Sequence, residues 1–284
     1  MTVLQALRRK VRPAGKTFQA VVRWRRMSFL EAPPVFGNAK PKSGSHLLLQ
    51  VLQGLTEIMP LAYVQADPIR SITREGQRRS PGEIRDDLKR IPRGVVGWGY
   101  LDPTPENVAF LCRPDRVNYF LYRDPRDLLV SQVFFATEMY EDHGMHAYYK
   151  SLPDFASRLS AAITGVDQDG LKMVSVRQRY EGVLEWLKAT HVLCLRFEDF
   201  ITRPDDTFDL MLDQVEKTGY RIPTPRPQAR RILRASIQPR KSRTFRSGKV
   251  GGWREHFKPE HKRLFLKVAG DLLVRLGYEN GDQW

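Results

Sequence analysis

The sequence predicts an α/β fold: a single domain with a central parallel sheet flanked by helices. Three short apolar segments, 35–39, 117–122 and 191–197, have the length and continuous hydrophobicity of strands buried on both faces. Each is followed by a longer segment with the apolar spacing of a helix, an alternation typical of a parallel sheet covered by helices. With 284 residues, of which 41% are hydrophobic, the chain is large enough to bury such a core.

A basic arm, residues 1–34, precedes the first strand and ends in Pro33-Pro34. Residues 1–26 contain eight Lys and Arg and no acid. A weak apolar spacing near the start of the arm predicts a short amphipathic helix that includes Val3, Leu4, Leu7 and Val11. The arm is expected either to be solvated or to lie on an anionic membrane surface through residues 1–26.

The predicted domain covers residues 35–284, and its helices follow from apolar spacing and from proline and capping signals. Asp124 and Pro125 predict a helix start, with the helix running to about Tyr140. Residues 66–94 are expected to form a loop region with one short helix near 81–89, and residues 142–170 a lid on the acceptor side. Further helices are expected at 46–58, 176–190, 204–218, 228–237 and 260–276, with an irregular basic loop at 239–253.

The formal charge of +15 points to an anionic partner. The excess is concentrated, because residues 221–263 contain fourteen Lys and Arg against two acids, in addition to the basic arm. Nucleic acid, a phosphorylated cofactor, anionic lipid and an acidic substrate all fit this charge.

Cysteine usage and hydropathy indicate a cytoplasmic, soluble protein. Cys112 and Cys194 each lie in an apolar stretch and are expected to be buried thiols, as in a reducing compartment. No apolar run approaches the roughly 20 residues that span a bilayer, and the first residues lack the pattern of a secretory signal.

The most informative motif is the strand–loop–helix at 35–58. Its turn, Pro41-Lys42-Ser43-Gly44-Ser45, precedes a helix whose first backbone N–H groups can bind phosphate. Gly44 allows close backbone approach, Lys42 adds a cation, and the two serines add hydroxyl donors. The motif is not a Walker A sequence, because the lysine precedes the glycine.

Two further segments carry cations beside turns. Tyr122-Arg123-Asp124-Pro125-Arg126-Asp127, with Ser131 one turn later, places an arginine at the carboxyl end of a strand, where open α/β sheets bind ligands. The segment from Arg243 to Trp253 combines glycines, cations and a tryptophan, so it fits a loop over a phosphorylated ligand or one that contacts nucleic acid.

In this order and spacing, the three segments resemble the sulfotransferase family, whose members transfer a sulfuryl group from 3′-phosphoadenosine 5′-phosphosulfate (PAPS) to an acceptor. Pro41 to Ser45 is similar to the family's PKSGT loop, and Tyr122 to Asp127 with Ser131 to its YRDPRD segment. Phe197-Glu198-Asp199 is similar to its FED strand end, and Arg246 to Trp253 to its RKGxxGDW loop. The resemblance covers roughly residues 35–278 and implies a P-loop NTPase-like cofactor site.

The resemblance also implies roles for individual residues. Lys42 would stabilise the leaving phosphate, while Ser43, Gly44, Ser45 and His46 would hold the 5′-phosphate. The 3′-phosphate would be held by Arg123, Ser131, Arg246, Ser247 and Gly248. The adenine pocket would be lined by Phe197 and Ser236. The spent cofactor would be 3′-phosphoadenosine 5′-phosphate (PAP), and no metal is expected, because no histidines pair at ligand spacing.

The sequence departs from the family pattern in the cofactor loop and at the general base. Ser247 stands where the family usually has lysine, Gly252 where it has aspartate, and Leu47 where many members have tryptophan. Tyr100 stands at the position of the histidine that deprotonates the acceptor, and an unperturbed tyrosine with a pKa of about 10 is a poor base at neutral pH. Other candidates are His46, Glu138, His143 and His146, of which His146 is preferred because it lies in the expected acceptor-side lid.

The leading prediction is therefore a sulfotransferase that acts on a hydroxyl or amine of a small molecule, lipid or carbohydrate. A kinase-like phosphotransferase is disfavoured, because the sequence lacks G-K-[ST] and a convincing carboxylate for Mg²⁺. A nucleic-acid-binding module would use the basic late region but leaves the Lys42 loop and the Arg123 segment unexplained. No specific nucleic acid is expected as a partner.

Overall fold

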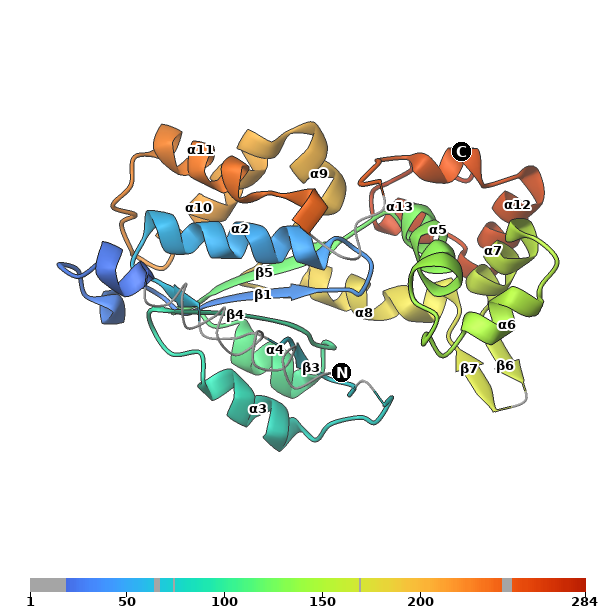
Figure 1. The fold of residues 1–284 in the computed structure, drawn as a ribbon, viewed down its shortest axis with the longest axis horizontal. Helices are drawn as coiled ribbons and strands as arrows, with labels where there is room; N and C mark the ends of the chain where they lie inside the picture. Colours follow the sequence, from blue (N-terminus) through green and yellow to red (C-terminus); the bar gives the residue numbers. More distant parts are fainter. Residues whose placement is uncertain (1–18, 64–66, 74, 169, 242–246) are drawn as a thin grey trace. The chain divides into compact units, whose positions relative to one another are not determined.

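The computed structural model describes residues 19–63, 67–73, 75–168, 170–241 and 247–284. The chain divides into two compact units, each built from two segments of the sequence. One, here called the sheet unit, comprises 1–122 and 189–238; the other, the helical unit, comprises 123–188 and 239–284 (Figure 1).

The sheet unit contains a six-stranded parallel sheet, which confirms the predicted α/β fold. The apolar segments at 35–39 and 117–122 form its centre and are buried throughout. The strand order is β2 (Ala62–Tyr63), β4 (Val95–Tyr100), β1 (Val35–Ala39), β5 (Val117–Tyr122) and β8 (Val192–Arg196), with β3 (Ile69–Arg70) paired to β4.

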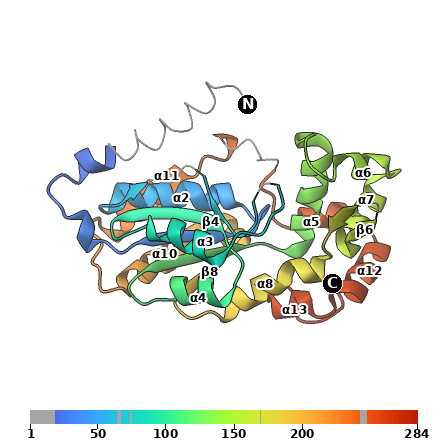
Figure 2. The same cartoon turned by 90° about the horizontal axis from the view of Figure 1, so that it is seen from below.

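Helices cover both faces of this sheet (Figures 1 and 2). One face carries α2 (Ser45–Ile58), α10 (Pro204–Glu216) and α11 (Arg226–Ser236), and the opposite face carries α3 (Pro81–Lys89) and α4 (Pro105–Leu111). A short helix, α9 (Phe197–Thr202), follows β8. The apolar stripe of α2 is fully buried at Leu48, Val51, Leu52 and Leu55, so packing against the sheet rather than intrinsic propensity holds this helix.

The helical unit is built around α5 (Pro125–Phe134), which begins at the predicted Asp124 cap: the carboxylate accepts from the Arg126 N–H at 2.9 Å. A π-helical turn, η2 (Phe135–Met139), extends it. Antiparallel strands β6 (Val166–Gln168) and β7 (Leu171–Met173) form a hairpin. The other elements are α6 (His146–Ser151), α7 (Phe155–Thr164), α8 (Val176–Lys188), η3 (Pro239–Lys241), η4 (Gly252–Glu255), α12 (Pro259–Ala269) and α13 (Leu272–Arg275).

Three strands of the sheet, β2, β3 and β4, were not predicted. In β4 two glycines, Gly97 and Gly99, interrupt the apolar run and hide its strand character. Gly99 has a structural reason: a Cβ at this position would lie 2.3 Å from the Ile69 carbonyl oxygen, so only glycine permits the close approach of β3. The expected loop region at 66–94 therefore contains β3 in addition to its predicted helix.

Several predicted boundaries are wrong for local reasons. The helix expected to reach Tyr140 leaves α-helical geometry after Phe134, and the last helix is interrupted at Gly270, where φ is +57°. The third strand ends at Arg196, and Phe197 begins α9. Residues 142–170 contain α6 and α7, anchored by buried side chains such as Tyr149 and Leu159, and their role as a lid stays a prediction.

The amphipathic helix predicted near Val3 lies outside the described residues. The described part of the arm begins with a helical segment, 19–23. The Trp24 indole donates a hydrogen bond to the Thr56 carbonyl oxygen at 2.9 Å, which fixes the arm to the end of α2. Within the part of the chain that the structure describes, no helix combines the length and hydropathy needed to cross a membrane.

Candidate functional site

The β1–α2 loop is a tight turn with two positive φ angles. Lys42 and Gly44 both have positive φ, +69° and +90°, so the chain reverses twice before α2 begins at Ser45. The Ser43 hydroxyl and N–H both donate to the Lys40 carbonyl oxygen, at 2.5 and 3.2 Å, which closes the turn. The first N–H groups of α2, which have no partner within the helix, therefore follow a loop whose backbone is held in place. Phosphate binding at a helix start uses such N–H groups.

Phe197 is positioned by Gly44. A Cβ at Gly44 would lie 2.4 Å from the Phe197 ring, so the ring packs directly against the glycine of the loop. The ring is buried at the start of α9, with 5% of the residue exposed. The sequence prediction that the 41–45 loop and Phe197 serve one site is compatible with this contact.

Ser236, the second residue predicted to line the adenine pocket, lies where α11 meets α2. Its hydroxyl donates to the Leu233 carbonyl oxygen at 2.6 Å, and a Cβ at Gly54 would lie 2.9 Å from the same hydroxyl oxygen. Gly54 thus allows the two helices to approach closely at this position.

Tyr100 is joined to the loop through Ser45, whose hydroxyl lies 2.8 Å from the tyrosine OH. Burial raises the pKa of Tyr100 above its usual value, and the hydrogen bond with Ser45 and the charge of Arg70 only partly oppose this effect. The Arg70 guanidinium lies 4.8 Å from the ring centre. Tyr100 is therefore a neutral phenol at physiological pH.

Sequence reasoning missed Asn38, which fixes the position of β4 beside β1. Its side-chain amide donates to the Leu101 carbonyl oxygen at 3.0 Å, and its side-chain oxygen accepts from the Leu101 N–H at 2.8 Å. The signal was a lone asparagine inside an otherwise apolar strand, where a buried amide needs partners. This pair of bonds sets Tyr100, one residue before Leu101, at the end of β4.

His46, on the first turn of α2, faces the ring of Trp98 at a centroid distance of 6.4 Å. Partial loss of solvent, followed by the nearby charge of Lys42, lowers the pKa of His46. The imidazole is therefore neutral at pH 7, although the residue keeps contact with solvent.

In the helical unit, Arg123 and Asp127 hold the late basic loop. Arg123 Nη2 donates to the Lys249 carbonyl oxygen at 3.0 Å and lies 3.8 Å from the Asp127 carboxylate. The two Asp127 oxygens accept from the N–H groups of Gly251 and Trp253, each at 2.8 Å. The loop is thus fixed to the start of α5 through its backbone.

Two departures from the family pattern lie in this loop. A Cβ at Gly252 would lie 3.7 Å from an Asp127 oxygen, an ordinary van der Waals contact, so the local space does not explain the glycine at 252. Lys249, the suggested substitute for the missing cation at 247, forms an ion pair with Glu255 through its ammonium group.

The other predicted 3′-phosphate residues belong to the same unit. Ser131 lies half-buried on α5, and the Lys249 N–H lies 3.4 Å from the Ser247 hydroxyl. Gly248 has φ +62°. Arg246 lies outside the described residues.

A buried ion pair and two tryptophans support this segment. The Arg126 guanidinium donates to the Asp124 carboxylate at 2.7 Å and to Glu279 at 2.5 Å. The rings of Trp253 and Trp284 lie 3.9 and 4.7 Å from the same guanidinium carbon. Burial raises the pKa of Asp124 and outweighs the opposing effect of Arg126.

The tautomer of neutral His146 is fixed by one hydrogen bond. Its Nδ1 lies 2.8 Å from the Ala136 carbonyl oxygen, which can only accept, so in the neutral imidazole Nδ1 carries the proton and Nε2 has the lone pair. His143 is used structurally, because its Nδ1 accepts from the Met145 N–H at 3.1 Å. Glu138 is exposed on η2.

Three of the fourteen cations in residues 221–263 pair with acids within the sheet unit. Arg230 forms a bidentate pair with Asp209, Arg234 lies 2.7 Å from Asp205, and Arg226 lies 2.5 Å from Glu216. Three of the four arginines of α11 are thus paired with acids of α10. This arrangement weakens the argument that the local excess of cations marks a nucleic-acid surface.

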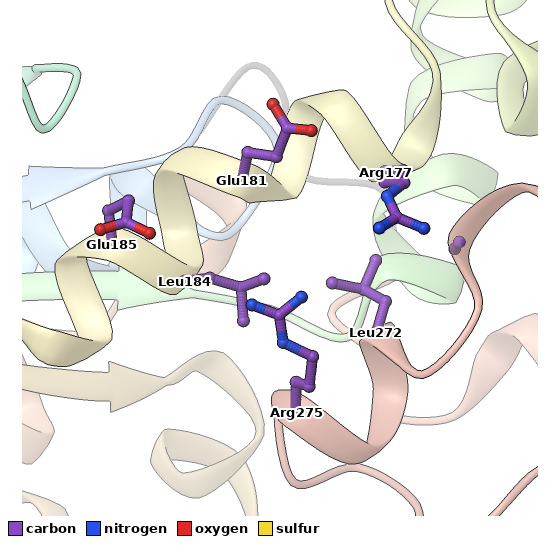
Figure 3. Close-up of a pocket in the computed structure, with 7 residues that line it drawn as sticks. Arg177, Glu181, Leu184, Glu185, Leu272 and Arg275 are labelled. Atoms are coloured by element: carbon purple, nitrogen blue, oxygen red, sulfur yellow. The ribbon is translucent and has the colours of Figure 1, made fainter.

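A pocket of about 150 Å³ lies between α8, α12 and α13, and none of the predicted site residues lines it. Figure 3 shows Arg275 projecting from α13 towards Leu184 of α8, and Arg177 beside Leu272. This volume is below the roughly 300 Å³ at which small-molecule and cofactor sites begin. Among the described residues, no three His, Cys, Asp or Glu side chains gather as a metal site requires.

Comparisons with known proteins agree with this fold. The family model for the sulfotransferase domain matches residues 119–277, more than half of the chain. The crystal structure of mouse sulfotransferase SULT7A1 complexed with PAP is similar, with 18% identity, a TM-score of 0.56 and 93% of each chain covered. A crystal structure of retinol dehydratase in complex with androsterone and the inactive cofactor PAP shares 16% identity, with a TM-score of 0.53 and coverage of 92% of this chain and 85% of that chain. A search of curated proteins found no match.

Proposed function

Because the chain belongs to the sulfotransferase domain family, and is thus an enzyme of sulfuryl transfer, we propose that PAPS binds at its two cation-bearing segments. The β1–α2 loop would hold the 5′-phosphosulfate. The segment that begins at Arg123, together with the loop from Ser247 to Trp253, would hold the 3′-phosphate. The two segments belong to different units.

The observation that carries the proposal is the backbone of the β1–α2 loop. A lysine with φ +69° is uncommon. Two residues later Gly44 has φ +90°, a backbone conformation that glycine adopts much more readily than other residues. A turn of this kind directs consecutive N–H groups and the helix start towards one anion. The residues present therefore fit a phosphosulfate group.

Each residue of the loop has a role that follows from its chemistry. Lys42 would place its ammonium group where negative charge develops on the leaving phosphate. The N–H groups of Gly44, Ser45 and His46 would bind the 5′-phosphate. Ser43 would join them by releasing one of its two hydrogen bonds to the Lys40 carbonyl oxygen. The adenine would lie near Phe197 and Ser236. When bound, PAPS supplies the sulfuryl group already attached to a good leaving group.

The 3′-phosphate half would rest on Arg123, whose guanidinium is held near Asp127 and the loop backbone. Ser131, Ser247 and Gly248 would add hydroxyl and N–H donors, and Arg246 a further cation. A fixed arginine at a strand end binds phosphate without much loss of side-chain entropy.

For the acceptor, we propose a hydroxyl or amine of a small molecule, lipid or carbohydrate. Tyr100 would act as a neutral hydrogen-bond partner of Ser45 and of the reacting groups, because burial raises its pKa. His146 remains the proposed base, since Nε2 keeps a lone pair. The androsterone bound to retinol dehydratase supports a small-molecule acceptor. A cytoplasmic location stays a prediction.

The test is a thermal-shift titration with PAP, beside AMP, ATP with Mg²⁺ and a DNA duplex. A ligand at about 100 times its dissociation constant adds about 2.7 kcal/mol to the free energy of unfolding. We expect PAP to raise Tm by several degrees and AMP, which lacks the 3′-phosphate, to raise it much less. A shift with ATP–Mg²⁺ or DNA, and none with PAP, would refute the proposal.

A further inference from the structure

Exposed apolar side chains concentrate in one short segment of the sheet unit. Among the described residues, eleven large hydrophobic side chains are exposed, and four of them lie within ten residues of the chain. Val21, Val22, Met27 and Leu30 are 48%, 52%, 37% and 72% exposed. Here residues 21–30 are called the apolar–basic patch. Such density is unusual, because exposed hydrophobic residues are ordinarily scattered singly.

Three arginines lie between Val22 and Met27 in the same segment. Arg23, Arg25 and Arg26 are all exposed within the patch. Arg23 lies 3.6 Å from Glu57, whereas Arg25 and Arg26 form no ion pair with any described residue. The sequence of residues 1–18 adds five Lys and Arg and no acid, which increases the local positive charge.

The backbone of the patch is held against the rest of the sheet unit by hydrogen bonds and close packing. The Trp24 indole is bonded to the Thr56 carbonyl oxygen, and Ala20 and Ala32 on either side are buried. Arg93 Nε donates to the Leu30 carbonyl oxygen at 2.5 Å. A Cβ at Gly94 would lie 2.4 Å from the Phe29 carbonyl oxygen, so this glycine permits the segment to pack closely. The apolar side chains are therefore held outward by a fixed backbone.

We propose that the apolar–basic patch is a docking surface for an anionic lipid bilayer. Val21, Val22, Met27 and Leu30 would enter the boundary between headgroups and acyl chains, where apolar side chains are stabilised. Arg25 and Arg26 would lie at the headgroups and attract the anionic lipids. A nucleic acid would use the arginines but leave the apolar side chains in water, so the bilayer fits both parts of the patch.

The test is sedimentation of the full chain with vesicles of phosphatidylcholine alone or mixed with phosphatidylserine. We expect binding to the mixed vesicles only, weakened by salt because exposed charges are screened. Leu30→Asp and Val22→Asp should each weaken this binding at least tenfold. The matched control is Leu210→Asp on α10, which places the same charge at a side chain that is 52% exposed, and should leave binding unchanged.

Each variant is first checked for an unchanged Tm, so that misfolding is not taken for loss of binding. An Arg25→Gln, Arg26→Gln double variant should bind weakly even in mixed vesicles. The proposal would be overturned if Leu30→Asp and Val22→Asp bind like the wild type, or if Leu210→Asp loses binding equally. Equal binding to neutral vesicles, or displacement of the protein from vesicles by a DNA duplex, would also contradict it. PAP binding should be the same in all variants, so this result is independent of the proposed cofactor site.

Discussion

The carboxylate of Asp127 and the backbone N–H of Trp253 form a hydrogen bond of 2.8 Å that ties the start of α5 to the late loop. The second carboxylate oxygen accepts from Gly251 at the same distance, and the Asp127 residue is 3% exposed. A single side chain thus fixes the loop backbone beside the proposed 3′-phosphate arginine.

We expect Asp127→Asn to weaken both the fold and the binding of PAP. The amide keeps one acceptor oxygen but presents an NH₂ group to a backbone N–H, leaving a buried donor without a partner at a cost of about 1–3 kcal/mol. Chemical denaturation and calorimetric titration with PAP measure the two effects. The control is Glu255→Gln, which breaks an exposed ion pair worth about 0.2–1 kcal/mol. A stability loss no larger than that of the control would mean that Asp127 does not hold the loop.

Lys42→Gly separates the chemistry of the ammonium group from its folding cost. Lys42 has φ +69°, which glycine adopts freely, so the variant should be as stable as the wild type or more stable. Turnover should fall by about 100- to 1,000-fold, because a charge that stabilises the transition state is lost. The expected loss of turnover is tested by measuring sulfuryl transfer from PAPS to a phenol, and the affinity for PAP, in Lys42→Gly and the wild type. Full activity would exclude Lys42 from the chemistry, and complete loss of PAP binding would assign it to cofactor binding instead.

Lys42 and Asp127 differ in how much of their structural role could be predicted from the sequence. The apolar runs that became β1 and β5, and the loop at 41–45, could be predicted because burial on both faces and turn chemistry leave a local signal. The Asp127 clamp could not, since it depends on a loop more than 120 residues later in the chain. The strand β4 was hidden for a similar reason: Gly99 is required by the carbonyl of Ile69, a contact that local periodicity does not encode. The burial that raises the pKa of Tyr100 is also a property of the assembled fold.

Gly44→Ala should be far more damaging than Gly76→Ala. Both glycines have φ near +90°, so the backbone penalty of about 1–2 kcal/mol is common to the pair. At Gly76 a Cβ would meet nothing within 4 Å, whereas at Gly44 it would lie 2.4 Å from the Phe197 ring. The additional overpacking should cost about 1–3 kcal/mol and shift the ring. Thermal unfolding measures the loss of stability, and the same measurement with PAP reports the effect on binding. Equal losses of stability in Gly44→Ala and Gly76→Ala would show that the ring contact contributes nothing.

His146→Asn tests the proposed base while keeping its structural bond. The asparagine amide nitrogen occupies the place of Nδ1 and can still donate to the Ala136 carbonyl oxygen, but nothing replaces Nε2. We expect stability within about 0.5 kcal/mol of the wild type. Loss of general base catalysis lowers turnover by about 100-fold or more. His143→Ala, which removes the acceptor for the Met145 N–H and the ring contact with Phe135, is the comparison. Wild-type turnover in His146→Asn would exclude this histidine as the base.

Tyr100→Phe should leave the shape of the pH–rate profile unchanged between pH 6 and 9. Burial raises the pKa of Tyr100 above 10, so the wild-type phenol does not titrate in that range. Because the pKa of Tyr100 is higher in the folded state, the folded protein holds the phenol proton more tightly than the unfolded chain does. The neutral phenol's contribution is therefore complete below pH 10 and lost as the pH rises through the folded pKa. Relative to Tyr100→Phe, the wild type should lose stability only above about pH 10. Disappearance of a neutral-pH limb in the variant would instead make Tyr100 the titrating base and contradict its role as a neutral partner of Ser45.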